Sequence, residues 1–305
     1  MSATRPTSGP RVVAVGGGHG LAASLRAVRR YAGTIDAVVT VADDGGSTGR
    51  LRAAAQRPAP GDLRKCLVAL ADPGSRLAAA MEHRFDAGEL AGHAFGNLLI
   101  LALAESGGEL VPALDEVARL IGAEGRVLPA TTEVVALCAQ LRGHDTVEGQ
   151  VAIGDRADVS TVSLDPPDPP ACPEAIGAIG AADQIVLGPG SLYTSVLAAV
   201  AVPGIGAALA DCTAQVVYVC NLRPQIPETA GYGVGDHVAA LERHGIRPDV
   251  VLYDPSSIGD AEGVPGAVPV EVARPSGLAH DPERLGDALA ARWEAARGAT
   301  VTGDA

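Results

Sequence analysis

The feature that most constrains the fold is an apolar run that leads through a glycine-rich loop into a helical pattern. Residues 11–15 read Arg-Val-Val-Ala-Val, which is typical of a buried strand, and Gly16-Gly17-Gly18-His19-Gly20 follows. Apolar residues then recur at helical spacing over residues 21–28. A strand, a glycine loop and a helix in this order form the first unit of a nucleotide-binding α/β fold. The loop does not match G-x-G-x-x-G, because Leu21 occupies the sixth position.

The same alternation returns in the second half of the chain and sets the fold class. A second strand is expected at residues 37–40, a mostly helical segment at 51–125, and a hairpin from 134–141 and 146–153. Further strands are expected at residues 184–187, 215–220, 249–253 and 268–272, with helices at 173–181, 235–244 and 282–297. The pattern predicts an α/β fold with a mostly parallel sheet and helices on both faces. We expect one domain over residues 11–298, between disordered tails at 1–10 and 299–305.

Composition and charge exclude several functional classes. The formal net charge is −13, so binding to nucleic acid or to an anionic membrane surface is not expected. No run of about 18 apolar residues predicts a membrane span, and residues 1–10 lack the apolar core of a signal peptide. Five scattered cysteines without a C-x-x-C pair favour reduced thiols in the cytoplasm. Walker, G-x-S-x-G and H-E-x-x-H motifs are absent. No catalytic residue is assigned, and a homo-oligomer stays open.

A crowded polar loop follows the expected second strand. Residues 43–50 read Asp-Asp-Gly-Gly-Ser-Thr-Gly-Arg. Adjacent carboxylates repel each other unless a metal ion, a ribose hydroxyl or a guanidinium takes up the charge. Asp44 is therefore a candidate ligand for Mg²⁺ that bridges phosphates, and Mg²⁺ is the one cofactor suggested. The aspartate pair does not decide between a metal and a ribose, and an ordinary turn is the alternative.

Other candidate residues surround these loops. Gly188-Pro189-Gly190-Ser191 follows an expected strand and opens a helix, so its amides are predicted to hold a phosphate. Arg50, Arg52 and Arg64 are candidates for bidentate phosphate contacts, and Asp62 is expected to cap the helix that follows it.

Two histidines and an asparagine stay open between binding and structural roles. His19 could donate to a phosphate, stack against one or act as a general base. His93 lies in the cluster His93-Ala94-Phe95-Gly96-Asn97, where it could instead simply cap a buried helix. Asn97 offers both donor and acceptor groups for a base or a sugar.

Taken together, the motifs resemble the bacterial gluconeogenesis-factor (YvcK-like) family. The matching segments are Gly16-Gly17-Gly18-x-Gly20-Leu21, residues 41–52 around Asp43-Asp44-Gly45-Gly46-Ser47, Pro60-Gly61-Asp62-Leu63-Arg64, residues 92–98, residues 188–195 and residues 221–231. Two departures are His19, where many members have Thr, and Pro227, where Gly is expected. The resemblance implies a cytoplasmic, modified Rossmann-like protein, similar to the CofD family of 2-phospho-L-lactate transferases. It also implies UDP-sugar binding and a link to cell shape and envelope synthesis, with no reaction attached.

Two hypotheses follow. The first is a nucleotide-sugar-binding regulatory protein, and the second is a CofD-like transferase that moves a phospho-containing group from a nucleoside diphosphate donor with Mg²⁺. A dinucleotide-dependent enzyme is a weaker third. The residues expected to bind the ligand are Gly17, Gly18, His19, Gly20, Asp43, Asp44, Gly45, Ser47, Arg64, His93, Asn97, Gly188, Pro189, Gly190, Ser191, Thr194, Ser195 and Asn221.

Overall fold

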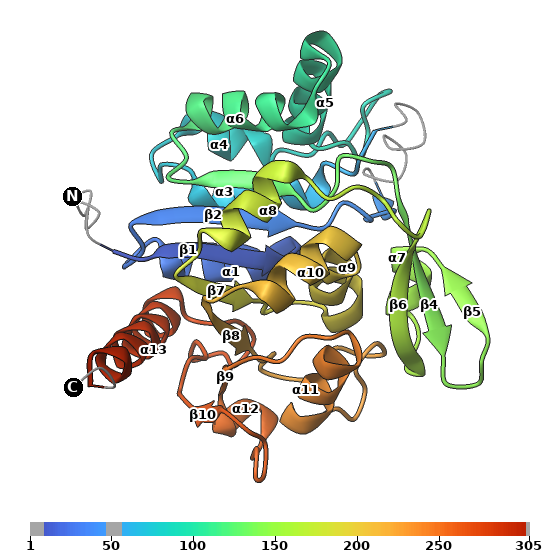
Figure 1. The fold of residues 1–305 in the computed structure, drawn as a ribbon. Helices are drawn as coiled ribbons and strands as arrows, with labels where there is room; N and C mark the ends of the chain where they lie inside the picture. The colour runs from blue at the N-terminus through green and yellow to red at the C-terminus, as the bar shows by residue number, and fades with distance from the viewer. Residues whose placement is uncertain (1–8, 47–56, 303–305) are drawn as a thin grey trace.

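A seven-stranded sheet, parallel throughout, forms the centre of the molecule (Figure 1). The computed structural model describes residues 9–46 and 57–302. The strands of this sheet are β1 (Arg11–Gly16), β2 (Thr34–Val39), β3 (Arg126–Pro129), β7 (Gln184–Leu187), β8 (Gln215–Val219), β9 (Val250–Tyr253) and β10 (Ala267–Pro269). Their order across the sheet is β10-β9-β8-β7-β1-β2-β3. Every neighbouring pair in it is parallel, which confirms the α/β, Rossmann-like prediction.

The order of strands reverses between β1 and β7. The chain first builds outward from β1 through β2 to β3, and then returns to place β7 on the other side of β1. Val12 pairs with Gln184 and Val15 with Leu187, so the carboxyl ends of β1 and β7 leave the sheet side by side. Parallel sheets of this kind bind ligands in the crevice at such a reversal.

Helices cover both faces of the sheet. Helices α1 (Gly18–Val28), α3 (Gly61–Leu70) and α13 (Pro282–Thr302) pack together on one face, and α8 (Pro173–Gly180), α9 (Leu197–Val200) and α10 (Pro203–Asp211) pack together on the other. Beyond β3 lie α4 (Arg76–Met81), α5 (Phe95–Gly107) and α6 (Leu110–Ile121), which with α3 bear out the expected helical segment (Figure 1). Helices α11 (Val234–Arg243) and α12 (Pro255–Ile258) flank β9 in the chain. Strands β1 and β7 are buried almost throughout, as continuous apolar runs in central parallel strands should be.

A small antiparallel sheet projects beside the carboxyl edge of the main one (Figure 1). Its strands are β4 (Ala136–Leu141), β5 (Thr146–Glu148) and β6 (Val159–Asp165). The expected hairpin is confirmed, but its second strand does not reach residue 153. Gly149 adopts φ 100°, and the helix α7 (Gln150–Gly154) begins after it. The main-chain amide of Val151 donates to Asp44 Oδ1, which fixes the start of α7 against the loop after β2.

Two further elements differ from the pattern in the sequence. The helix expected after the second glycine loop starts as a π-helical segment, η1 (Leu192–Val196), and continues as α9. The last strand, β10, ends at Pro269 rather than at residue 272. Proline has no backbone N–H to donate to the hydrogen bonds between strands. Within the described ranges, no single helix has the length and apolarity to cross a membrane. Two consecutive helical segments, Leu192–Val200 and Pro203–Asp211, reach that length and apolarity only when taken together, and they are bent by 78° relative to each other.

Candidate functional site

The two glycine loops touch each other at the strand reversal. A Cβ atom added to Gly20 would overlap the carbonyl oxygen of Pro189 and lie 2.5 Å from Gly190 Cα. The hydroxyl of Ser24, on the same helix, donates to the carbonyl of Gly188. Only a residue without a side chain lets these backbones approach so closely, which explains glycine at this position. The loops that leave β1 and β7 therefore form one continuous wall.

The start of α1 carries uncapped amides. Gly17 is the N-cap residue, it provides no side-chain cap, and the first turn contains no acidic residue. The first N–H groups of a helix have no partner within the helix, and its dipole makes this end partly positive. Such an end is suited to an anionic group.

The second loop is held by the protein's own side chains, which sequence reasoning did not anticipate. The buried carboxylate of Glu228 accepts bonds from the amides of Leu192 and Thr194 at 3.0 Å each, and from the Thr194 hydroxyl at 2.7 Å. Asn221 accepts from Gly190 N and donates to Gly190 O. Burial raises the pKa of Glu228, and its bonds to Thr194 and Leu192 partly offset this rise. The amides of Leu192 and Thr194 are therefore bonded internally, so the uncapped helix start in this wall belongs to α1.

A cavity of about 290 Å³, which we call the glycine-loop cavity, opens beside this wall. Nine of the predicted ligand residues line it: Gly17, Gly18, His19, Gly20, Asp43, Gly190, Ser191, Thr194 and Ser195. Four residues that were not predicted to bind the ligand also line it: Asp62, Lys65, Gln150 and Gln225. Gln150 and Gln225 come from α7 and the loop after β8, which are distant in sequence. The spacing of Asp62 and Lys65 on one helix face was a signal that could have been used.

Asp62 does not cap its helix as expected. Pro60 is the N-cap residue of α3, and Asp62 lies buried in the first turn. Its Oδ1 pairs with Lys65 Nζ at 3.0 Å, and a Cβ on Gly17 would lie 2.5 Å from its Oδ2. Burial lowers the pKa of the nearby His19, and the charge of Lys65 lowers it further, so this imidazole is neutral at pH 7.

The adjacent aspartates separate into two roles. Asp43 lines the cavity, and its Oδ1 accepts from the amide of Gly45 at 2.9 Å. Asp44 accepts from Val151 N at 3.0 Å and contributes to neither cavity at this edge. Three of the candidate residues fall outside the described residues: Ser47, Arg50 and Arg52. A magnesium ion on Asp44 stays a prediction, but Asp43 is the member of the pair that faces the cavity.

Arg64, His93 and Asn97 belong to the region where α3, α4 and α5 meet. Arg64 is buried, pairs with Glu82 at 2.8 Å and donates to the carbonyl of Met81. Asn97 is also buried, and its Oδ1 has no hydrogen-bond partner among the described residues. None of the three lines either cavity at the carboxyl edge.

A second cavity of about 640 Å³, the adjoining cavity, shares His19, Gly20, Gly190 and Gln225 with the first. Pro189 and Asn221 from the predicted set also line it. Its rim carries Ile226, which is 85% exposed, and Leu278, which is 62% exposed. These are the two most exposed large apolar side chains in the described part of the chain. The glycine-loop cavity is therefore a polar compartment, and the adjoining cavity next to it has an apolar rim.

His280, on the wall of the adjoining cavity, gives a pH prediction. Its Nε2 donates to the carbonyl of Cys220, and burial lowers its pKa to about 4. The ordinary pKa of histidine is about 6.5. Between this value and pH 4, His280 is therefore protonated in the unfolded chain but neutral in the folded chain. The contribution of neutral His280 to the free energy of unfolding is fully present above pH 6.5. It is lost as the pH falls toward 4, by up to about 3 kcal/mol. Denaturant unfolding at several pH values should show a shallower acid loss for His280→Gln, and equal slopes would contradict the assignment.

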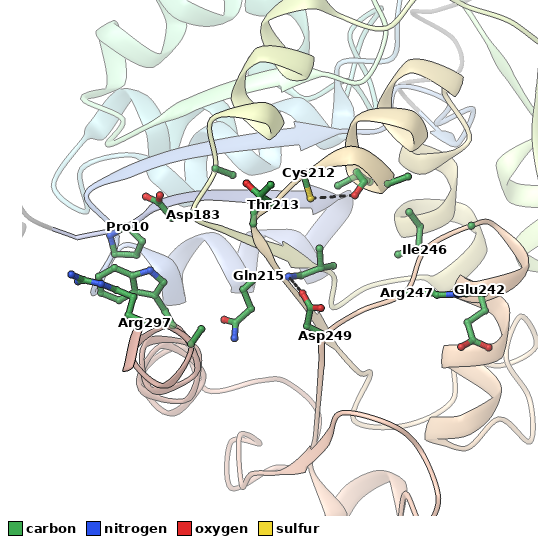
Figure 2. A pocket seen from close by; sticks show the side chains of 18 of the residues that line it. Pro10, Asp183, Cys212, Thr213, Gln215, Glu242, Ile246, Arg247, Asp249 and Arg297 are labelled. Carbon is green, nitrogen blue, oxygen red and sulfur yellow. Dashed lines mark hydrogen bonds between the residues drawn. The ribbon is translucent and has the colours of Figure 1, made fainter. Parts of the chain in front are cut away.

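A third cavity, larger than these two, lies at the opposite edge of the sheet, where the strands begin. It measures about 1170 Å³ and lies between the starts of β7, β8 and β9 and helix α13 (Figure 2). Two of its three acidic residues are already bonded to the backbone: Asp183 accepts from Arg11 N and Asp249 from Val216 N. These bonds fix strand starts. Size alone therefore does not make this the functional site, because ligands of parallel sheets bind at the carboxyl edge.

The residues at the carboxyl edge fit Mg²⁺ only together with a phosphate. Among the described residues, no three His, Cys, Asp or Glu side chains group closely enough to hold a metal ion. Asp43 and Asp62 both line the glycine-loop cavity. One or two carboxylates completed by phosphate oxygens are the usual protein contribution to a magnesium site.

Comparison with known proteins agrees with this fold. The model of the family "2-phospho-L-lactate transferase CofD" matches residues 12–271. The chain belongs to the CofD family. The gluconeogenesis factor of Bacillus subtilis is 40% identical, over 77% of this chain and 75% of its own length. A relative from Deinococcus radiodurans is 40% identical, over 94% of this chain but 66% of its own length. The crystal structure of a UPF0052-family protein from Bacillus halodurans superposes with a TM-score of 0.86 at 34% identity, covering 91% of this chain and 97% of that one.

The two aspartates can be separated by matched substitutions. We expect Asp44→Ala to lower the free energy of unfolding by about 0.5–2 kcal/mol, because Val151 N at the start of α7 loses its acceptor. Asp43→Ala should change stability less and instead abolish the effect of Mg²⁺ on the affinity for a diphosphate ligand. Thermal unfolding and titration with and without Mg²⁺ measure both effects. Identical behaviour of the two variants would contradict the separation.

Proposed function

We propose that this chain is a regulatory protein that binds a nucleotide sugar of the UDP-sugar class. The diphosphate would lie against the glycine loops, with the rest of the ligand reaching into the adjoining cavity. The observation that carries the proposal is the uncapped start of α1 at the strand reversal, beside a cavity lined by both loops. An anionic group supplies acceptors to these amides and matches the positive end of the helix dipole.

The shape of the edge supports a ligand with two chemically different parts. The glycine-loop cavity is lined by glycines, hydroxyls and charged groups, whereas Ile226 and Leu278 flank the adjoining cavity. Exposed apolar side chains at a pocket rim are suited to a flat or partly apolar group. A nucleotide sugar combines such a base with a charged diphosphate.

The proposed biological role follows the names of relatives. The Bacillus subtilis and Halalkalibacterium halodurans relatives are named gluconeogenesis factors. We infer a regulatory role in carbon metabolism for this chain, reaching cell shape and envelope synthesis through the level of the bound nucleotide sugar. Under this proposal binding itself is the signal, and no substrate is consumed.

A CofD-like transferase is the second candidate, and one observation favours it. A transferase needs room for an acceptor beside the phosphates, and the adjoining cavity offers about 640 Å³ there. The family model is also named for a transferase. In this case Asp43 and Asp62 would hold Mg²⁺ with the donor's phosphates, and the ion would offset the charge on the leaving group. The glycine-loop amides would hold and orient that group.

Calorimetric titration tests the first proposal. We expect saturable binding of UDP-N-acetylglucosamine or UDP-glucose, and weaker binding of GDP and NAD, with Mg²⁺ present and absent. Failure of both UDP-sugars to bind would refute it. Mass spectrometry of the same mixtures reports turnover of the nucleotide donor. A consumed nucleotide donor would establish the transferase instead.

A further inference from the structure

Lys65 occupies a special place in both the sequence and the structure. It is the only lysine in a chain whose other 22 basic residues are arginines. It lies on α3, and its side chain lines the glycine-loop cavity with 23% of its surface exposed. Its ammonium nitrogen is 3.0 Å from Asp62 Oδ1, three residues earlier on the same helix.

Among the described residues that line the cavity, Lys65 carries the only positively charged side chain, and the other formal charges are the carboxylates of Asp43 and Asp62. The imidazole of His19 is neutral at pH 7, because burial and Lys65 both lower its pKa. A phosphate against the α1 amides would therefore meet two negative side chains and one ammonium group.

The Asp62–Lys65 pair is also suited to being exchanged. The Asp62 side chain is 5% exposed and the Lys65 side chain 23%, so the lysine is the partner that reaches both solvent and the cavity. An ammonium group on a flexible four-carbon stem can change partners, whereas the planar fork of arginine is bound to one geometry. A phosphate carrying up to two charges attracts the ammonium more strongly than one carboxylate does.

We propose that Lys65 is the phosphate-binding side chain of the glycine-loop cavity, and that a phosphate or diphosphate ligand binds by drawing its ammonium group from Asp62 to a phosphate oxygen. The identity of the ligand as a nucleotide sugar rests on the proposed function. The phosphate contact itself does not, because inorganic pyrophosphate is enough to form it.

The single lysine makes a direct chemical test feasible. The unmodified chain is acetylated with a limiting amine-reactive ester in metal-free buffer, and mass spectrometry follows Lys65 and the α-amino group separately. Pyrophosphate or UDP at about ten times its Kd should slow acetylation of Lys65 about tenfold and leave the α-amino group unchanged. Unchanged Lys65 acetylation with ligand bound would overturn the proposal, and so would the absence of saturable pyrophosphate binding.

Substitutions provide the second arm. Lys65→Gln should weaken pyrophosphate and UDP binding about tenfold or more without changing the weak binding of uridine, and Lys65→Arg should restore part of the loss. The matched control is Arg119→Gln, which removes one positive charge and a similar i,i+3 pair, with Glu116, from an exposed helix face. Equal affinities for pyrophosphate in Lys65→Gln and Arg119→Gln would refute the role of Lys65. UDP-sugar binding that survives in Lys65→Gln would then leave the proposed function standing. Pyrophosphate protection of Lys65 without any nucleotide binding would support the lysine contact and refute the nucleotide-sugar proposal.

Discussion

Gly20→Ala is expected to abolish ligand binding and to lower the free energy of unfolding by about 1–3 kcal/mol. The added methyl group would overlap Pro189 O and approach Gly190 Cα, both backbone atoms that cannot rotate away. The loops after β1 and β7 must then separate, and the amides of α1 move from the wall of the cavity. Chemical denaturation and calorimetric titration of UDP-N-acetylglucosamine measure the two effects.

A matched control is available on another helix. Gly107, at the end of α5, has open space around its Cβ direction and a φ that other residues adopt readily. Gly107→Ala should leave binding unchanged and stability equal or slightly higher. If Gly20→Ala bound the ligand as tightly as Gly107→Ala, the contact between the two loops would not matter for the site.

Glu228→Ala is expected to have the largest effect on stability. The substitution leaves the buried amides of Leu192 and Thr194 without their acceptor, at a cost of about 2–5 kcal/mol in the free energy of unfolding. The first turn after the second glycine loop should loosen, so ligand affinity should fall as well. Thermal unfolding and hydrogen exchange of residues 188–196 provide the readouts.

Two comparisons make this prediction specific. Glu228→Gln keeps one acceptor oxygen and the side-chain volume, so it should lose less stability than the alanine variant. Glu105→Ala, at an exposed position on α5, should change unfolding by less than about 0.5 kcal/mol. A Glu228→Ala protein as stable as Glu105→Ala would show that the carboxylate does not hold the loop.

The fold could be predicted from sequence because local patterns determine it. The apolar runs within β1 and β7, each followed by glycines and a helical pattern, specify buried parallel strands and crossovers without knowledge of any distant contact. The reversal between them then places the two glycine loops together. The nine residues that gather in the glycine-loop cavity were predicted because they lie in polar loops that follow expected strands.

The rest of the site depends on contacts between residues far apart in sequence. Nothing near Leu192 reveals that Glu228 caps its helix, and nothing near Asp44 reveals that Val151 is its partner. Both aspartates of the Asp43-Asp44 pair therefore looked alike, although only Asp43 faces the cavity. Asp62 was assigned to a helix cap because aspartate favours that position, but the chain places proline there and turns the carboxylate toward Gly17 and Lys65.

The central claim is that an anionic ligand binds the glycine loops at the carboxyl edge of the sheet. Hydrogen exchange followed by mass spectrometry, with and without UDP-N-acetylglucosamine, tests it most directly. We expect slowed exchange in peptides covering residues 17–21 and 188–196, and no change in those covering residues 209–216 and 293–297 at the opposite edge. Protection confined to the peptides around the larger cavity, with the glycine loops unchanged, would contradict the claim.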